Sequence, residues 1–136
     1  MKYYFKTILY TISSWLLLSS CETVAVKHSV SKHKARVTYY CASEDRRWKN
    51  KRADGGRIQP CRTAAMSKDI PFGSVVKIPA LKPVIGCDQF TVQDRGGVVE
   101  SRKASHGLLP IVDVAVESKK MIKWLAAVMP PVLDIE

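Results

Sequence analysis

Six short runs of β-forming residues, each bounded by turn or breaker residues, constrain the fold of this sequence more than any other feature. They are Arg36–Cys41, Arg62–Met66, Ser74–Ile78, Gln89–Gln93, Ile111–Val116 and Val132–Glu136. Valine, isoleucine, threonine and aromatic residues are frequent in them, and segments such as Ile70–Gly73 and Pro79–Gly86 separate them, as in short strands joined by turns. Six such strands within about 100 residues predict a mainly β fold, closed into a small barrel.

One helix is expected, in the C-terminal half of the chain. Its apolar residues recur at positions i, i+3, i+4 and i+7, as on one face of a helix, and are Met121, Trp124, Leu125 and Val128. Ser118 can cap the amino end with its hydroxyl group. Pro130 and Pro131 end the helix, because neither residue can continue it.

The start of the chain predicts a removable export signal. Lys2 and Lys6 precede an uncharged stretch, Thr7–Ser20, which is shorter than the roughly 20 apolar residues that a membrane-spanning helix needs. Leu18–Cys21 is similar to the bacterial lipobox, in which the cysteine is lipidated and the chain is cut before it. The alternative is an ordinary secretory signal followed by an incidental cysteine.

This motif divides the chain into three parts. Residues 1–20 form the lipoprotein signal peptide, residues 21–35 the lipidated cysteine with a flexible tether, and residues 36–136 the barrel domain. Glu22, rather than Asp, follows the lipidated cysteine, which in a bacterium with two membranes favours sorting to the outer membrane. We therefore expect an exported protein, lipid-anchored through Cys21 on the periplasmic face of the outer membrane.

Three further cysteines remain: Cys41, Cys61 and Cys87. An exported chain lies in an oxidising compartment, so one disulfide and one unpaired thiol are expected. The sequence leaves open which two cysteines pair. Because their spacings contain no Cys-x-x-Cys motif and the three histidines supply no paired ligand set, we expect neither a metal nor any other cofactor.

The charge balance predicts an anionic partner. The chain has 22 Lys and Arg against 12 Asp and Glu, a formal charge of +10, and removal of the leader with Lys2 and Lys6 leaves 20 against 12, or +8. The long surface loop Glu44–Gly56 surrounds Trp48 with basic residues, a mixture that also suits nucleic acid: Arg46, Arg47, Lys49, Lys51 and Arg52. Export makes nucleic acid an unsuitable target, so an anionic cell-wall polymer is the better candidate.

Two aspartates are candidate chemical groups. Asp113 interrupts the apolar run Ile111–Val116, and a buried carboxylate is costly unless it is hydrogen-bonded or its pKa rises until it is neutral. A raised pKa is what a general acid requires. Asp94 follows a strand and precedes Gly96 and Gly97, which let the backbone turn tightly or approach a ligand. The alternatives are structural: Asp94 caps a turn, and Asp113 bonds to a buried backbone amide.

A basic loop lies between these two aspartates. The segment Glu100–Gly107 contains Arg102, Lys103 and His106, which could hold carboxylates of a substrate. The alternative is a solvated basic loop without a ligand.

Five segments, in this order, resemble the 3D (Asp-Asp-Asp) domain family. They are Val37–Tyr40, Arg62–Met66, Ile70–Ser74, Asp94–Gly97 and Val112–Val114. Domains of this family are double-psi β-barrels, like those of membrane-bound lytic transglycosylase A and rare lipoprotein A. The resemblance covers roughly residues 36–136. It implies a six-stranded double-psi barrel that acts on peptidoglycan.

The resemblance also implies roles for individual residues. Asp113 corresponds to the family's catalytic acid, Asp94 to the aspartate beside it, and Thr38 to a polar residue near the site. The residues expected to bind substrate are Thr38, Arg95, Gly96, Gly97, Arg102 and Lys103.

The implied reaction is that of a lytic transglycosylase. Asp113 would protonate the glycosidic oxygen between N-acetylmuramic acid and N-acetylglucosamine, and its carboxylate would then take the proton of the muramic 6-hydroxyl as a 1,6-anhydro ring closes. The partner is the glycan strand, and the protein is expected to be a monomer. Two alternatives stay open: an expansin-like module that binds glycan without cutting it, and a structural envelope lipoprotein whose barrel has no ligand.

Overall fold

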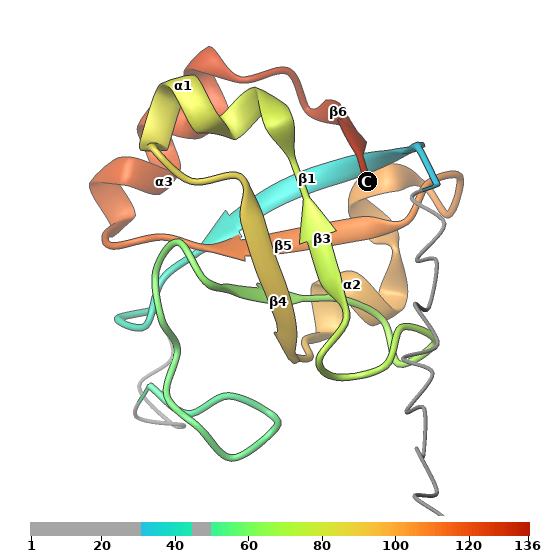
Figure 1. The fold of residues 1–136 in the computed structure, drawn as a ribbon, viewed down its shortest axis with the longest axis vertical. Helices are drawn as coiled ribbons and strands as arrows, with labels where there is room; N and C mark the ends of the chain where they lie inside the picture. Colours follow the sequence, from blue (N-terminus) through green and yellow to red (C-terminus); the bar gives the residue numbers. More distant parts are fainter. Residues whose placement is uncertain (1–30, 45–49) are drawn as a thin grey trace, which may run out of the picture.

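The structure, a computed structural model, describes residues 31–44 and 50–136. The expected export signal, the lipidation site Cys21 and most of the basic group around Trp48 lie outside the described residues. In the part that is described, the chain is mainly β, with six strands in a nearly closed barrel and a few short helices (Figure 1).

All six expected strands are present. They are β1 (His33–Tyr40), β2 (Thr63–Ala65), β3 (Val75–Lys77), β4 (Gln89–Asp94), β5 (Ile111–Ala115) and β6 (Val132–Ile135). The largest difference in bounds is at β1, which begins three residues before Arg36. Ala35 is fully buried there and pairs with Leu133 of β6. The last residues of the expected tether, 33–35, therefore belong to the barrel.

The expected helix is confirmed as α3 (Lys119–Val128). The Ser118 hydroxyl oxygen accepts a hydrogen bond from the backbone N–H of Met121 at 3.3 Å, and Leu125 is buried. The expectation of a single helix is incomplete, because four short helical segments also occur: η1 (Pro79–Leu81), α1 (Lys82–Ile85), α2 (Gly97–Ser101) and η2 (Lys103–Ser105). Segments of three to five residues are too short to show a helical period in a sequence.

The sheet mixes parallel and antiparallel neighbours. Its strand order is β3-β4-β2-β5-β1-β6, in which β1 is parallel to β5 and β2 is parallel to β4, while the other neighbours are antiparallel. In Figure 1, β3 and β4 cross in front of β1 and β5. The two outer strands meet where Lys77 and Glu136 exchange backbone hydrogen bonds of 2.8 and 2.9 Å. This narrow seam makes the barrel nearly closed.

The two faces of the barrel wall carry different sets of side chains, because successive residues of a strand point to opposite faces. The main hydrophobic core lies on the inner face and includes Val37, Val92, Val112 and Val114. A smaller apolar cluster lies on the outer face, where α2 packs on β5, and contains Ala65, Val99 and Ile111. Asp113 lies between Val112 and Val114 in β5 and therefore points to the outer face.

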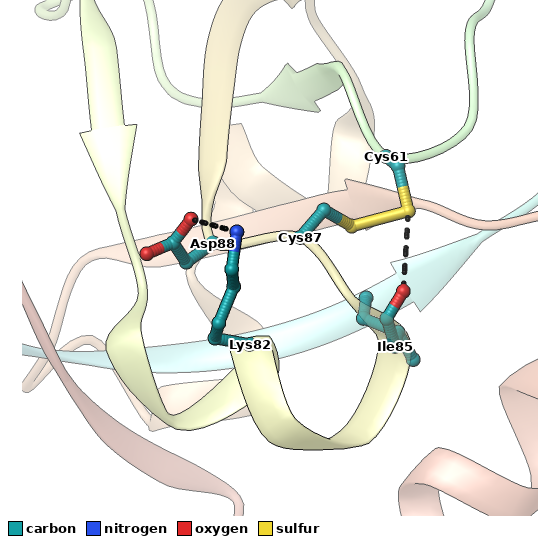
Figure 2. Close-up of a disulfide and its surroundings, with 5 residues drawn as sticks. All are labelled: Cys61, Lys82, Ile85, Cys87 and Asp88. Carbon is teal, nitrogen blue, oxygen red and sulfur yellow. Dashed lines mark hydrogen bonds and ion pairs between the residues drawn. A yellow bond between two sulfur atoms is a disulfide. The ribbon is translucent and has the colours of Figure 1, made fainter.

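A disulfide joins Cys61 to Cys87, and Cys41 is a buried free thiol. Cys61 lies two residues before β2 and Cys87 two residues before β4, so the bond ties together the starts of two adjacent parallel strands (Figure 2). Beside the disulfide, the Lys82 ammonium group lies 3.6 Å from the Asp88 carboxylate. The sequence leaves the cysteine pairing open, and the structure shows a Cys61–Cys87 bond that fixes β2 relative to β4.

Candidate active site

One row of residues crosses four adjacent strands on the outer face. In the register of the sheet, Thr38 of β1 lies beside Asp113 of β5. Asp113 lies beside Ala65 of β2, and Ala65 lies beside Asp94 of β4. Neighbours in register point to the same face of a sheet. The two aspartates therefore face the same side, with Cα atoms about 10 Å apart at two strand spacings.

A register shift in β4 places Asp94 in this row. Ala64 pairs with Val92, but the next residue, Ala65, pairs with Asp94, so that Gln93 is an extra residue in the strand. Regular alternation would put Asp94 on the inner face with Val92, among apolar side chains. The bulge turns its carboxyl group to the outer face, and bulges next to active sites commonly redirect a side chain in this way.

Both aspartates line one cavity of about 610 Å³. The end of β1, residues 50–58 and the connection from β4 into α2 form its walls, and its lining includes Tyr40, Glu44, Arg52, Asp94, Gly96 and Asp113. Asp113 is only partly buried. It is therefore not sealed inside the barrel, and a ligand in the cavity can reach it.

Asp113 has the properties of an acid that holds its proton at mildly acidic pH. Burial raises its pKa from 3.8 to about 6, the charges of Glu44 and Asp94 act in the same direction, and the hydrogen bond from Thr38 opposes them. The Thr38 hydroxyl donates to Oδ1 of Asp113 at 2.8 Å. Among the described residues, Oδ2 has no hydrogen-bond partner, so Oδ2 is the oxygen available to carry a proton towards a ligand.

Asp94, in contrast, is held by three hydrogen bonds. Its Oδ2 accepts from the Tyr40 hydroxyl at 2.9 Å, and its Oδ1 accepts from the backbone N–H groups of Ala53 at 2.8 Å and Arg95 at 2.9 Å. Both oxygens are thus engaged and the carboxylate is fixed in position. The two aspartates occupy different environments, which is the arrangement that separates the roles of paired carboxylates in active sites.

The Tyr40 hydroxyl is expected to stabilise the protein through Asp94. Replacing Tyr40 by Phe leaves Oδ2 of Asp94 without this donor, so we expect the free energy of unfolding to fall by about 1–3 kcal/mol. Urea denaturation measures the change. The matched control is Tyr39→Phe, because the buried Tyr39 hydroxyl has no hydrogen-bond partner among the residues described. Equal losses in the two variants would contradict a specific role for Tyr40.

The segment before β2 forms one wall of the cavity. The Arg52 side chain, only 12% exposed, donates to Oδ1 of Asp54 at 2.9 Å and to Oε1 of Gln93 at 2.8 Å. It packs against Gly56, where a Cβ atom would collide with the guanidinium group. The described part of the loop Glu44–Gly56, which the sequence predicts to be a surface loop, thus packs on the end of β4.

Gly96 and Gly97 also line the cavity, with open space above them. A Cβ atom added at either residue would meet no atom within 4 Å. There is therefore room for a ligand to approach the backbone closely at both positions.

The guanidinium group of Arg95 has other partners. It donates to the carbonyl oxygens of Met66 at 3.0 Å and Ile70 at 2.6 Å, and it lies 4.1 Å from the ring centroid of Phe72. Arg95 lines the cavity, but its charged end holds the loop before β3. The structure thus gives this side chain a structural role beside the expected substrate-binding one.

Arg102 and Lys103 lie outside the cavity lining. An Arg102 nitrogen is 3.3 Å from a carboxylate oxygen of Asp69, and Lys103 is exposed in η2, followed by exposed His106. The structure does not bring these three basic residues to the aspartates. Their surroundings fit the alternative of a solvated basic segment.

Among the described residues, nine that line the cavity are not in the site predicted from the sequence: Tyr40, Cys41, Glu44, Asn50, Lys51, Arg52, Ala53, Ile58 and Ala65. Tyr40 follows Thr38 by two positions and therefore shares its face of β1, a signal that the sequence contains. The sequence identifies Arg52 only as part of the basic loop, and the contact that joins Arg52 to Gln93 links distant segments, for which local sequence gives no signal.

Within residues 31–44 and 50–136, no group of three or more His, Cys, Asp or Glu side chains is suited to hold a metal ion. Over the same ranges, no helix has both the length and the apolar character needed to cross a membrane. The sequence matches no protein-family model, and no curated protein is significantly similar to it. Function is therefore inferred from the site itself.

Proposed function

We propose that this protein is a peptidoglycan lytic transglycosylase of the 3D type, built on a double-psi β-barrel, in which Asp113 is the catalytic acid and base. One observation carries the proposal: a carboxyl group with a pKa of about 6 shares an open cavity with a second, fixed aspartate. Cleavage of a glycosidic bond needs a group that holds a proton within reach of the leaving oxygen.

The positions of the five family-like segments support this proposal. Four of them supply the row on the outer face, namely Thr38, Ala65, Asp94 and Asp113. The fifth segment, Ile70–Ser74, packs against the guanidinium group of Arg95. Four segments that are far apart in the sequence thus meet at one cavity, which is expected if they form a shared active site.

In the proposed reaction Asp113 acts twice. It first donates its proton to the glycosidic oxygen, and the bond between that oxygen and C1 of N-acetylmuramic acid breaks. The muramic 6-hydroxyl oxygen then bonds to C1, and its proton passes to the Asp113 carboxylate, which restores the acid. One carboxyl group suffices, because the nucleophile, the 6-hydroxyl oxygen, is part of the substrate.

Other lining groups orient the sugar. Asp94 is fixed by its three donors and supplies a negative charge that helps to keep the Asp113 pKa high. The accessible backbone at Gly96 and Gly97 can donate N–H groups to sugar oxygens. Both contributions support the acid without replacing it, so we expect their removal to affect the rate less than loss of the acid itself.

The pH dependence of the reaction follows from the pKa of Asp113. The acid must be protonated, so kcat/KM is expected to be highest below about pH 6 and to fall about tenfold per pH unit above it. Initial rates of anhydro-muropeptide release between pH 4 and pH 8 measure the profile. An inflection near the ordinary carboxyl pKa, without one near 6, would contradict the assignment.

Glu44→Gln supplies a matched test of the same profile. The negative charge of Glu44 raises the pKa of Asp113, so its removal is expected to move the inflection to lower pH. Glu117→Gln, an exposed carboxylate outside the cavity lining, is the control and should leave the inflection unchanged.

The decisive experiment incubates the purified protein with peptidoglycan sacculi and identifies the products by mass spectrometry. Release of 1,6-anhydro-muropeptides supports the enzyme. Retention of the protein on sacculi without products assigns it instead to the glycan-binding modules. If the protein neither releases products nor is retained, the structural lipoprotein is the remaining alternative. For the envelope anchor on Cys21, an unchanged precursor mass after globomycin treatment of the producing cells would contradict lipidation.

A further inference from the structure

A second cavity, of about 310 Å³, lies outside the proposed catalytic site. Its lining residues are Gln59, Arg62, Val75, Gln89, Thr91 and Gln93. None of them lines the cavity that contains Asp94 and Asp113. They come from β3, β4 and the segment that leads into β2, so this cavity lies on the outer face of the sheet over these three strands.

The lining has the chemistry of a hydrogen-bonding site with one positive charge. Three lining residues are glutamines, whose amide groups both donate and accept hydrogen bonds. Arg62 is exposed and forms no ion pair with any residue that the structure describes. No carboxylate lines the cavity, so an anionic ligand would meet no like charge there. A guanidinium group binds a carboxylate through two parallel hydrogen bonds.

The spacing along β4 matches that of an extended peptide. Gln89, Thr91 and Gln93 are alternate residues of this strand, and alternate residues of a strand lie about 6.6–6.8 Å apart. In an extended peptide, amide groups that point in the same direction repeat at the same distance. A row of side-chain amide and hydroxyl groups therefore fits a short extended peptide, and the nearby Arg62 fits its carboxylate.

The two cavities share a wall. Arg52 lines the first cavity, and its Nη1 donates to Oε1 of Gln93, which lines the second, at 2.8 Å. Gln93 is also the neighbour of Asp94 in β4. A substituent on a sugar that occupies the first cavity thus has a short path to the second, over the contact between Arg52 and Gln93.

We propose that the second cavity binds the carboxylate-bearing stem peptide attached to muramic acid, so that the protein prefers peptide-bearing strands to naked glycan. This inference rests on the proposed function, because it takes the first cavity to hold the sugar. Arg62 is the residue that binds the peptide carboxylate, and the glutamines bind its amide groups.

The test compares sacculi that carry stem peptides with sacculi stripped of them by an amidase. We expect Arg62→Gln to weaken binding of the full chain to peptide-bearing sacculi about tenfold and to leave binding to stripped sacculi unchanged. The control is Lys120→Gln, which removes one exposed positive charge from α3 and should change neither. In a second arm, calorimetric titration with purified stem peptide should show binding to the wild type that Arg62→Gln weakens.

The outcomes separate this inference from the proposed function. If Arg62→Gln binds peptide-bearing sacculi as the wild type does, while anhydro products are still released, the peptide cavity is refuted and the proposed function stands. An equal loss on both kinds of sacculi also refutes it, because the cavity would then bind glycan. Binding of free peptide that depends on Arg62, without any release of anhydro products, supports the cavity and refutes the proposed function.

Discussion

Replacing Asp113 by Asn is expected to lower the rate of anhydro-muropeptide release by about 10²- to 10⁴-fold, the contribution of a general acid. The amide can neither donate an acidic proton to the glycosidic oxygen nor accept the proton of the 6-hydroxyl. Its oxygen can still accept the hydrogen bond from Thr38, so the local geometry is kept. Initial rates on sacculi, measured by mass spectrometry at pH 5, give the ratio of variant to wild type.

The same substitution is expected to stabilise the fold at neutral pH, which separates loss of chemistry from loss of structure. The folded-state pKa of Asp113 is raised from 3.8 to about 6. The contribution of Asp113 to the free energy of unfolding is therefore fully present below about pH 3.8 and is lost as the pH rises through about 6. At pH 7 the variant should therefore unfold with a free energy up to about 3 kcal/mol higher than the wild type. At pH 3.5 the two should be nearly equal. A folded variant that cuts at the wild-type rate would rule out Asp113 as the acid.

Removing the disulfide is expected to have the largest effect on stability. The bond closes a loop with a sequence separation of 26 residues. In the chain-entropy description, Cys61→Ser combined with Cys87→Ser lowers the free energy of unfolding by about 3–4 kcal/mol. Urea denaturation of the oxidised wild type and of the double variant measures the difference.

Reduction supplies the control for this prediction. A reducing agent should destabilise the wild type by a similar amount and leave the double variant unchanged, since Cys41 has no partner to lose. Wild type whose denaturation midpoint does not respond to reduction would contradict the prediction.

Local sequence predicts the strands and α3 well, because their signals are contained within each segment. The cap at Ser118 and the stop at Pro130 bound the helix within a residue or two, and the apolar run around Asp113 becomes β5. The start of β1 was predicted too late, because His33–Ala35 have few β-forming residues and are held in the strand by β6.

The site was predictable only where one segment carries the signal. Asp113 stands out because a carboxylate interrupts an apolar strand, and Asp94 because two glycines follow it closely. The wall formed by Arg52 depends on Gln93, which lies 41 residues further along the chain, and no sequence pattern links the two. The basic segment Glu100–Gly107 shows the opposite case, because its charge pattern suggests a ligand but Arg102 pairs with Asp69.

The bulge in β4 has a bearing on how such a site can change over evolutionary time. A β4 shorter by Gln93 would still set Asp94 beside Ala65, in regular register. Two lengths of this strand are thus compatible with the same pair of acids. What the longer version adds is a glutamine that anchors Arg52, so we expect loss of the extra residue to open the wall around the acids without displacing them.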